Sequence, residues 1–317
     1  MGAVTDASGP WITVVGSTMI DLVAYAKRLP ERGETLAGER FAQGFGGKGA
    51  NQAVMARLMG AHVAMVNCLG DDGYGEQYLA NFARYGIDTT HVRRVPGSSG
   101  VAPIWVEGDG SNRIIIIPGA NLAMDPAQGA DAIRSQARVD AVIGQFEIEQ
   151  AVTTAAFAAA RARGAVTILN PAPGAPIAPE LAAVSDWIVP NETEFAIIAR
   201  AAGLPDDPAD PQALGRMAQG LGTRLLVTLG ERGAALVAAD GEVHMVGAPR
   251  VTAMDTTGAG DAFVGAFAYG LACGWDELAA ARLGCAIAAD SVTRAGTQSS
   301  FPDPDRCAAI EAQARAA

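Results

Sequence analysis

Residues 141–169 read AVIGQFEIEQAVTTAAFAAARARGAVTIL, an apolar run, a helical pattern and a second apolar run. Ala141–Gln145 and Val166–Leu169 have the length and character of buried strands, and Ala151–Arg163 between them has the character of a helix. A strand, a crossover helix and a second strand form the unit from which parallel sheets are built. This stretch therefore predicts an α/β fold.

The same alternation continues on both sides of this unit. Further buried strands are predicted at Trp11–Val15, Val63–Leu69, Trp187–Val189 and Leu225–Leu229, and further helices at Gly49–Met59, Tyr78–Tyr85 and Pro211–Leu221. Residues 1–317 are therefore expected to form one domain, a doubly wound, mostly parallel sheet flanked by helices. Such sheets bind ligands beyond the carboxyl ends of their strands.

Two stretches interrupt this rhythm. Gly33–Phe45 is glycine-rich and loosely alternating, and Val101–Val106 and Arg113–Ile117 flank a turn at Glu107–Ser111. No crossover helix follows either stretch. We expect both to form a small separate sheet at the edge of the main domain.

Composition limits the function classes. The chain carries 34 acidic and 23 basic residues, a formal charge of −11, which argues against a general nucleic-acid binder with its basic face. The N-terminus has no signal-peptide pattern, and no apolar run reaches membrane-spanning length. We therefore expect a cytoplasmic protein without a nucleic-acid or membrane partner. Its cysteines show no metal-binding spacing and are expected to be ordinary thiols: Cys68, Cys273, Cys285 and Cys307.

The strongest motif is DTTGAGDAF at Asp255–Phe263, which precedes a helical pattern. Gly258 and Gly260 let the backbone curl so that successive N–H groups point at one spot, and the helix start behind them completes an anion-binding nest. Asp261 then lies at the nest, where its carboxylate can accept a proton from a hydroxyl. The alternative is a glycine-rich turn with a helix-capping aspartate.

A second motif, GFGGKGAN, covers Gly44–Asn51. Its glycines match the dinucleotide-binding pattern GxGxxG, but that pattern must directly follow a buried strand, and Glu39–Gln43 is polar and does not resemble one. A Walker A motif also fails, because no Ser or Thr follows Lys48. We expect a loop that lets a small polar ligand approach the backbone, with Asn51 supplying an amide. A plain helix-entry loop is the alternative.

Four further features have equally ordinary structural explanations. Asp21 follows the first strand, and Glu147 follows strand Ala141–Gln145 at the ligand edge. Asn191–Glu194 has the pattern of a helix capping box, which is compatible with a second task beside a hydrated Mg²⁺. Thr228–Gly233 is a strand end followed by a tight turn.

Together these pieces resemble the ribokinase-like (PfkB) sugar-kinase family over nearly the whole chain. The segments that carry the resemblance are Gly33–Thr35, Gly46–Asn51, Asn170–Pro173, Asn191–Glu194, Thr228–Gly233, Asp255–Asp261 and Ala295–Ser300. The resemblance implies a phosphotransferase with an alcohol group as acceptor, using ATP, Mg²⁺ and K⁺. Within the family it favours the members that act on D-ribose at its 5-hydroxyl, giving ribose 5-phosphate and ADP.

The resemblance also implies residue roles. Asp261 would be the catalytic base, with Gly258, Ala259 and Gly260 in the anion hole. The sugar contacts, besides Asp261, would be Asp21, Gly46, Gly47, Lys48, Asn51 and Glu147. The nucleotide contacts would be Asn191, Thr228, Leu229, Gly230, Glu231, Arg232, Gly233 and Gly260. Glu194 would hold Mg²⁺ through water, and a monovalent cation would be ringed by Asp255, Thr257, Ser291, Arg294, Gly296 and Ser300.

The irregular β segments, about residues 17–45 and 99–119, match the family's lid, which pairs subunits. Ile114–Ile117 gives a lid strand two apolar faces, which favours a homodimer formed through the lid.

One departure concerns the acceptor: many ribose-specific members have Asn where this chain has Met19. The alternatives are a kinase of the same fold for another sugar, deoxyribose, a sugar acid or a nucleoside. Outside this class stand an NAD(P)-dependent oxidoreductase, suggested by GxGxxG, and a non-catalytic sugar sensor.

Overall fold

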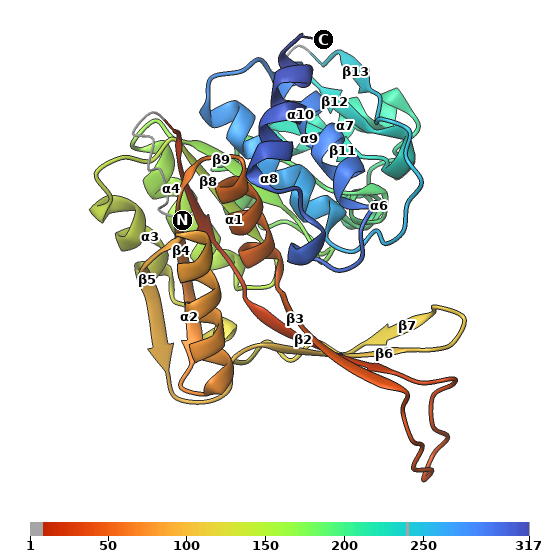
Figure 1. The fold of residues 1–317 in the computed structure, drawn as a ribbon. Coiled ribbons are helices and arrows are strands. Elements are labelled where there is room, and N and C mark those ends of the chain that lie inside the picture. Colours follow the sequence, from red (N-terminus) through yellow and green to blue (C-terminus); the bar gives the residue numbers. More distant parts are fainter. Residues whose placement is uncertain (1–8, 239–240, 317) are drawn as a thin grey trace.

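The computed structural model describes residues 9–238 and 241–316, and its centre is a large sheet (Figure 1). The sheet has nine strands in the order β13-β12-β11-β10-β9-β8-β1-β4-β5. From β5 to β11 neighbouring strands are parallel, whereas β12 and β13 are antiparallel additions at one edge. The strands are β1 (Trp11–Val15), β4 (His62–Gly70), β5 (Asp88–Val95), β8 (Ala141–Gln145), β9 (Val166–Asn170), β10 (Trp187–Ile188), β11 (Arg224–Thr228), β12 (Ala234–Val237) and β13 (Val243–Val246).

Helices cover both faces of this sheet. They are α1 (Lys48–Leu58), α2 (Gly73–Tyr85), α3 (Pro126–Ser135), α4 (Gln150–Arg161), α5 (Pro179–Ala182), α6 (Glu192–Ala201), α7 (Pro211–Leu221), α8 (Ala259–Ala272), α9 (Glu277–Ser291) and α10 (Pro304–Ala316). Buried side chains of α1, α2, α8, α9 and α10 form one core cluster, and those of α3 to α7 form a second. Ile12 and Val14 of β1 belong to the first cluster and Val15 to the second, as strand alternation requires.

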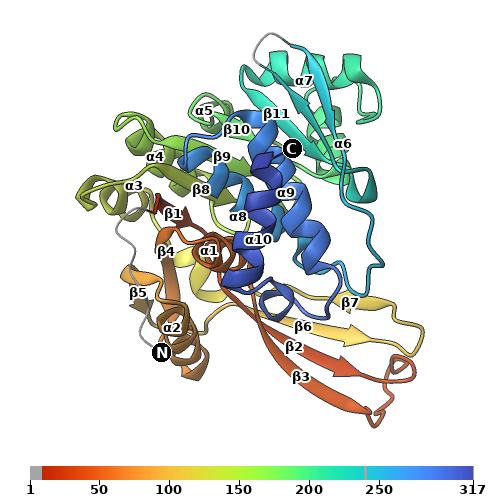
Figure 2. The same ribbon diagram turned by 45° about the horizontal axis from the view of Figure 1, so that its top comes forward.

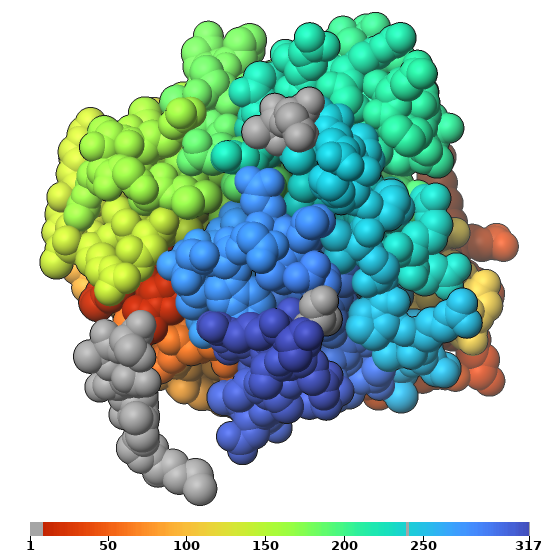
Figure 3. Space-filling view, turned by 90° about the horizontal axis from the view of Figure 1, so that it is seen from above, coloured from red at the N-terminus to blue at the C-terminus, as the bar shows by residue number. Residues whose placement is uncertain are grey.

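The predicted doubly wound α/β fold is therefore confirmed. In the view from above, the C-terminal helices lie at the middle of the surface, in blue (Figure 3). No helix in the described part of the chain is both long and apolar enough to cross a bilayer.

Most predicted elements appear within a few residues of their expected bounds, and three strands were missed. β5 (DTTHVRRV) is a polar edge strand, and β12 and β13 are short antiparallel strands without a crossover helix. The helix expected from Tyr78 begins earlier, at Gly73, because the Asp72 side chain accepts a hydrogen bond from Gly75 N and caps it.

A second, four-stranded sheet projects from the main body (Figures 1 and 2). Its order is β3-β2-β6-β7, from β2 (Met19–Tyr25), β3 (Arg40–Gly46), β6 (Val101–Val106) and β7 (Asn112–Ile114). We call these four strands the lid. They confirm the predicted small sheet, and Glu39–Gln43 is, as expected, not part of a buried strand. β3 is a lid strand with partly exposed side chains, and its polar residues reflect that position.

Only the first residue of the isoleucine run Ile114–Ile117 belongs to β7. Ile114 is the last residue of β7, and Ile115 N and Ile117 N continue the pairing by donating to Pro103 O and Val101 O. All four isoleucine side chains are between 45% and 54% exposed. The lid of this chain therefore presents an uncovered apolar surface.

Side chains of the main body fix the base of the lid. Asn121 accepts from Thr18 N (2.9 Å) and donates to Thr18 O (2.8 Å) just before β2. Asp72 accepts from Ser99 N and Ser99 Oγ (2.8 and 2.7 Å) just before β6. Tyr78 donates its hydroxyl to Gly46 O at the end of β3. These contacts anchor the lid beside the carboxyl ends of β1 and β4.

Candidate active site

The predicted site residues gather at the carboxyl edge of the parallel sheet. Glu147 follows β8, Asn191 follows β10 and Thr228 ends β11. The N-terminal ends of α1 and α8 supply Lys48 and Asp261 to the same edge. This is the position at which open α/β sheets bind ligands.

Asp261 lies in the first turn of α8 and is buried. Its Oδ2 accepts a hydrogen bond from Asn51 Nδ2 (2.8 Å), and its Oδ1 accepts one from Gln52 Nε2 (3.0 Å). Burial raises the pKa of Asp261 above its ordinary value, while the charge of Lys48 and these two hydrogen bonds act in the opposite direction. Gly258, the residue before α8, has a φ of 76°, a conformation that favours glycine.

Lys48 brings positive charge to an acidic site. Burial acts to lower its pKa, but the charges of Asp261, Glu147 and Glu194 outweigh that effect and raise it. The backbone N–H of Lys48 donates to Glu147 Oε2 (2.9 Å), which also accepts from Ser17 Oγ (2.5 Å). Lys48 therefore stays charged and balances three surrounding carboxylates.

The glycine-rich loop before α1 is held against β2 and the end of β1. A Cβ on Gly46 would lie 2.5 Å from both Asp21 carboxylate oxygens, and one on Gly49 would lie 2.5 Å from Ser17 N. Gly47 has a φ of 84°. The loop follows the lid strand β3 rather than a strand of the parallel sheet, so it lacks the βαβ context of a dinucleotide-binding fingerprint.

A cavity of 160 Å³ opens beside Asp261. Its lining includes Lys48, Asn170, Asn191, Glu194, Thr228, Gly258, Gly260 and Asp261. The capping box predicted at α6 is present, since Glu194 N donates to Asn191 Oδ1 (2.8 Å) and Asn191 N donates to Glu194 Oε2 (2.9 Å). Acidic, basic and amide groups thus converge on one small space.

Residues of the Thr228–Gly233 turn, expected to contact a nucleotide, line two different hollows. Thr228 lines the cavity beside Asp261, whereas Leu229 and Arg232 line a separate hollow of 1230 Å³ on the α7 side. Arg232 forms an ion pair with Glu192. Gly230, Glu231 and Arg232 form a short 3₁₀ turn that Gly233 closes. A ligand in the cavity beside Asp261 would therefore meet this turn at Thr228.

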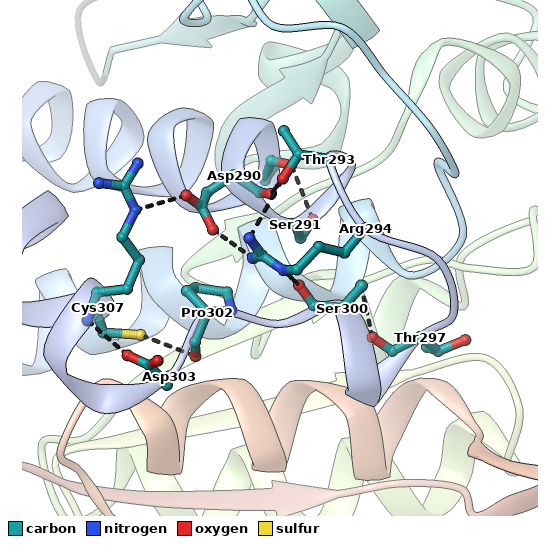
Figure 4. A network of polar contacts seen from close by, with 11 residues as sticks. Asp290, Ser291, Thr293, Arg294, Thr297, Ser300, Pro302, Asp303 and Cys307 are labelled. Atoms are coloured by element: carbon teal, nitrogen blue, oxygen red, sulfur yellow. Dashed lines mark hydrogen bonds and ion pairs between the residues drawn. The ribbon is translucent and has the colours of Figure 1, made fainter.

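The segment proposed to ring a cation is braced by its own side chains (Figure 4). Arg294 Nε donates to Ser300 O (2.9 Å), and the guanidinium groups of Arg294 and Arg306 both pair with Asp290. Ser291 Oγ and Ser300 Oγ donate to the carbonyl oxygens of Ala288 and Thr297 (both 2.8 Å).

Asp255 joins this segment to the start of α8. Its carboxylate accepts from Thr257 N and Gly296 N (both 2.9 Å). Burial acts to raise the pKa of Asp255, but hydrogen bonds from the Thr257 side chain, from Gly296 N and from Thr257 N outweigh it and hold the pKa below its ordinary value. Within residues 9–238 and 241–316, no group of three or more His, Cys, Asp or Glu side chains is arranged to hold a metal ion.

Sequence reasoning missed four buried amide side chains around Asp261. Gln52 and Asn170 contact each other (3.0 Å), Gln145 donates to Gln52 (2.6 Å), and Gln298 donates to Asn51 (3.0 Å). Asn170 and Gln298 belong to segments that carry the family resemblance, and this membership could have identified both as site residues.

Asp21, on lid strand β2, has a strongly raised pKa. Burial and the charges of Glu147 and Asp261 raise its pKa from 3.8 to about 7. Because the folded state binds this proton more tightly, the free energy of unfolding falls as pH rises through the window between those two values.

We therefore predict that Asp21→Asn raises Tm at about pH 8 and raises it less at about pH 5. Thermal unfolding at both pH values measures this. Asp125→Asn is the control. The Gln128 N–H keeps the pKa of Asp125 below its ordinary value, so this replacement should lower Tm instead of raising it. An equal rise for Asp21→Asn at both pH values would contradict the assignment.

Comparison with known proteins agrees with this geometry. The pattern of the pfkB family of carbohydrate kinases matches residues 11–304. A deoxyribokinase from Salmonella typhi is 41% identical over 296 residues, 92% of this chain and 95% of the relative. A mouse ribokinase is 37% identical over 319 residues, 95% of this chain and 97% of the relative.

Solved structures give the same result. Arabidopsis thaliana ribokinase, solved with ribose and ATP, superposes with a TM-score of 0.87 at 30% identity and covers 96% of this chain and 99% of its own. A Thermotoga maritima ribokinase gives 0.85 at 34% identity, covering 95% and 99%. The chain belongs to the pfkB family of carbohydrate kinases.

Proposed function

We propose that this kinase transfers the γ-phosphoryl group of ATP to the 5-hydroxyl of a pentose. The observation that carries the proposal is the buried Asp261 carboxylate at the start of α8, facing a cavity that Lys48 and Gly260 also line. D-ribose, the acceptor expected from the sequence, would give ribose 5-phosphate and ADP.

In this reaction the protein mainly supplies position and charge. Asp261 accepts the proton of the attacking hydroxyl, while the backbone N–H groups of Gly258, Ala259 and Gly260 stabilise negative charge on the phosphoryl group. Asp21, Asn51, Glu147 and the Gly46–Lys48 loop hold the sugar. Asn191 and the Thr228–Gly233 turn hold the nucleotide. Closure of the lid over the sugar would exclude water, which competes with the sugar for the phosphoryl group.

Two cations fit the residues present. Mg²⁺ would accompany ATP and neutralise phosphate charge, and Glu194, which lines the cavity, would hold it through water. A K⁺ ion would be held by the ionised Asp255 and by main-chain oxygens of the Asp255–Thr257 and Ser291–Ser300 segments. The side chains of Ser291, Arg294 and Ser300 already donate to the carbonyl oxygens of Ala288, Ser300 and Thr297, respectively.

Met19 favours 2-deoxyribose as a second candidate acceptor. Alternation along β2 puts Met19 on the same face as Asp21, and its buried sulfur lies 3.9 Å from Asn121 Nδ2. A thioether cannot replace an amide as a hydrogen-bond partner, so a hydroxyl facing it gains little over a missing hydroxyl. The similarity to a deoxyribokinase supports the same candidate.

A panel of acceptors tests the proposal. Coupled ADP release should show that ribose and 2-deoxyribose exceed fructose and adenosine in kcat/KM by about tenfold or more. Met19→Asn should raise the ratio of kcat/KM for ribose to that for 2-deoxyribose, and it should leave KM for ATP within about twofold. A preference for a hexose or a nucleoside would contradict the pentose proposal, and an unchanged ratio would contradict the role of Met19.

We also propose a homodimer formed through the lid. The exposed run Ile114–Ile117 and the 65% exposed Phe41, at opposite edges of the lid sheet, are apolar and uncovered, and a second copy would cover them. Light scattering at micromolar concentration should give the mass of two chains. Ile115→Lys should shift the population to monomer, and a monomeric wild-type protein would contradict the proposal.

A further inference from the structure

Two chains of buried amides end on the Asp261 carboxylate. In the first chain, Asn81 Nδ2 donates to Gln298 Oε1 (2.9 Å), and Gln298 Nε2 donates to Asn51 Oδ1 (3.0 Å). Asn51 Nδ2 then donates to Asp261 Oδ2 (2.8 Å). This row of hydrogen-bonded amides joins α2, the turn after α9, α1 and α8 in the interior of the molecule.

The second chain begins at the carboxyl ends of β8 and β9. Gln145 Nε2 donates to Gln52 Oε1 (2.6 Å), and Gln52 Nε2 donates to Asp261 Oδ1 (3.0 Å). Gln52 Nε2 also donates to Asn170 Oδ1 (3.0 Å), whose amide in turn donates to Val189 O (2.9 Å). Asp261 is thus held at both oxygens, by consecutive residues of α1.

From Asn81 and from Gln145, successive amide donors point toward Asp261, whereas the branch through Asn170 runs away from it to Val189 O. An ionised carboxylate only accepts hydrogen bonds, so Asn51 and Gln52 must both turn their NH₂ groups to it. The side-chain oxygens of Asn51 and Gln52 are then left to accept hydrogen bonds from Gln298 and Gln145. These outer amides must therefore also turn their NH₂ groups inward. The Asp261 carboxylate therefore sets the orientation of the amide side chains out to the outer end of each row.

The outer end of the second chain shows a cost of this arrangement. Gln145 Oε1 is buried without a hydrogen-bond partner among the described residues. It lies only 2.0 Å from the position of a Cβ on Gly16, so the side chain is closely confined. An unsatisfied buried oxygen is unfavourable. Its presence is consistent with a network whose orientation is set by Asp261.

The charges around Asp261 make the amides important. Lys48 of α1 is the positive group that acts on it, whereas Glu194 of α6 and Asp21 of β2 are negative groups that interact with it. Glu147, beyond β8, adds a further acid next to Lys48. Since burial also disfavours the ionised form, one lysine opposes several unfavourable effects. The oriented amide dipoles supply the remaining stabilisation.

We propose that Gln52 and Gln298 are positioning residues that fix the orientation of the Asp261 carboxylate and stabilise its ionised form. Gln52 acts directly on Oδ1, and Gln298 acts through Asn51 on Oδ2. With one donor on each oxygen, rotation of the carboxylate breaks a hydrogen bond, and a free lone pair stays directed to the cavity. This inference rests on the proposed role of Asp261 as the base.

The test replaces each glutamine with methionine, which has a similar length and no amide. For Gln52→Met and Gln298→Met we expect kcat to fall about tenfold to a hundredfold, as misplacement of a catalytic group does. KM for ATP should stay within about twofold. The acid limb of the kcat–pH profile should move upward by about one unit, because the ionised carboxylate loses a hydrogen bond.

Gln128→Met is the matched control. Gln128 is a half-buried glutamine whose amide donates to Asn67 O (2.9 Å) and His91 O (3.2 Å), away from Asp261. This variant should lose stability and keep both kcat and the acid limb. The inference is overturned if both test variants keep kcat and the acid limb, or if Gln128→Met moves the limb as far as they do.

A readout without substrate separates this inference from the proposed function. Carbon NMR of aspartate-labelled full-length protein follows the Asp261 carboxyl, which the missing signal in Asp261→Asn identifies. We expect its pKa to rise in both glutamine variants. If this rise occurs in a protein without pentose kinase activity, the proposed function alone fails. If the enzyme is active and the pKa does not move, the positioning role is wrong.

Discussion

Asp261→Asn should lower kcat by on the order of 10²- to 10⁴-fold, the usual range for loss of a general base. The replacement keeps the size of the side chain but cannot accept the hydroxyl proton. It also places an NH₂ group against the NH₂ of either Asn51 or Gln52, which now donate to the carboxylate. Steady-state kinetics should show the loss in kcat, with both KM values within about tenfold.

Asp186→Asn is the control for this variant. Asp186 accepts hydrogen bonds from Thr167 N and Thr167 Oγ1 (both 2.9 Å) near the start of β10, at the opposite edge of the sheet. Its replacement should lower Tm and leave kcat within about twofold. If Asp261→Asn kept more than about a tenth of the wild-type kcat, Asp261 would not be the base.

Gly49→Ala should lower kcat/KM for the sugar by about a hundredfold, because a small displacement at a binding site has effects of this size. An added Cβ would lie 2.5 Å from Ser17 N and 2.7 Å from Gly16 C, both main-chain atoms that cannot rotate away. Ser17 Oγ donates to Glu147, so the displacement would spread to a proposed sugar contact. ATP binding, measured by calorimetry, should change little.

Gly73→Ala is the matched control for the added methyl group. Gly73 is the first residue of α2, and a Cβ there would meet no atom within 4 Å. Its kcat/KM should stay within about twofold of wild type. If Gly49→Ala behaved like Gly73→Ala, the close packing of the glycine loop would not be required for sugar use.

Local patterns account for the parts of this protein that its sequence predicts. The capping box at Asn191–Glu194 and the glycine turn before Asp261 each depend on residues a few positions apart, and both lie at the carboxyl edge as expected. β1 and β8 were found because continuous apolar runs mark strands covered on both faces. β5 was missed because an edge strand with the sequence DTTHVRRV is too polar to stand out.

The amide network could not be predicted in the same way. Gln298 and Asn51 are 247 positions apart in sequence, and Gln52 and Asp261 are 209 apart. A single sequence gives no pattern for such pairs, and an isolated Gln in an apolar helix has many ordinary explanations. The partners become evident only when α1, α2, α8 and the Gln298 turn are brought together.

The position of phosphate on the product tests the central claim most directly. The wild-type enzyme, ATP and Mg²⁺ would be incubated with ribose and with 2-deoxyribose, and phosphorus and carbon NMR would locate the phosphate. The account predicts one pentose 5-phosphate for each ADP formed with at least one of these sugars, and its loss in Asp261→Asn. ADP formation without sugar phosphate, or phosphate on the anomeric hydroxyl, would contradict it.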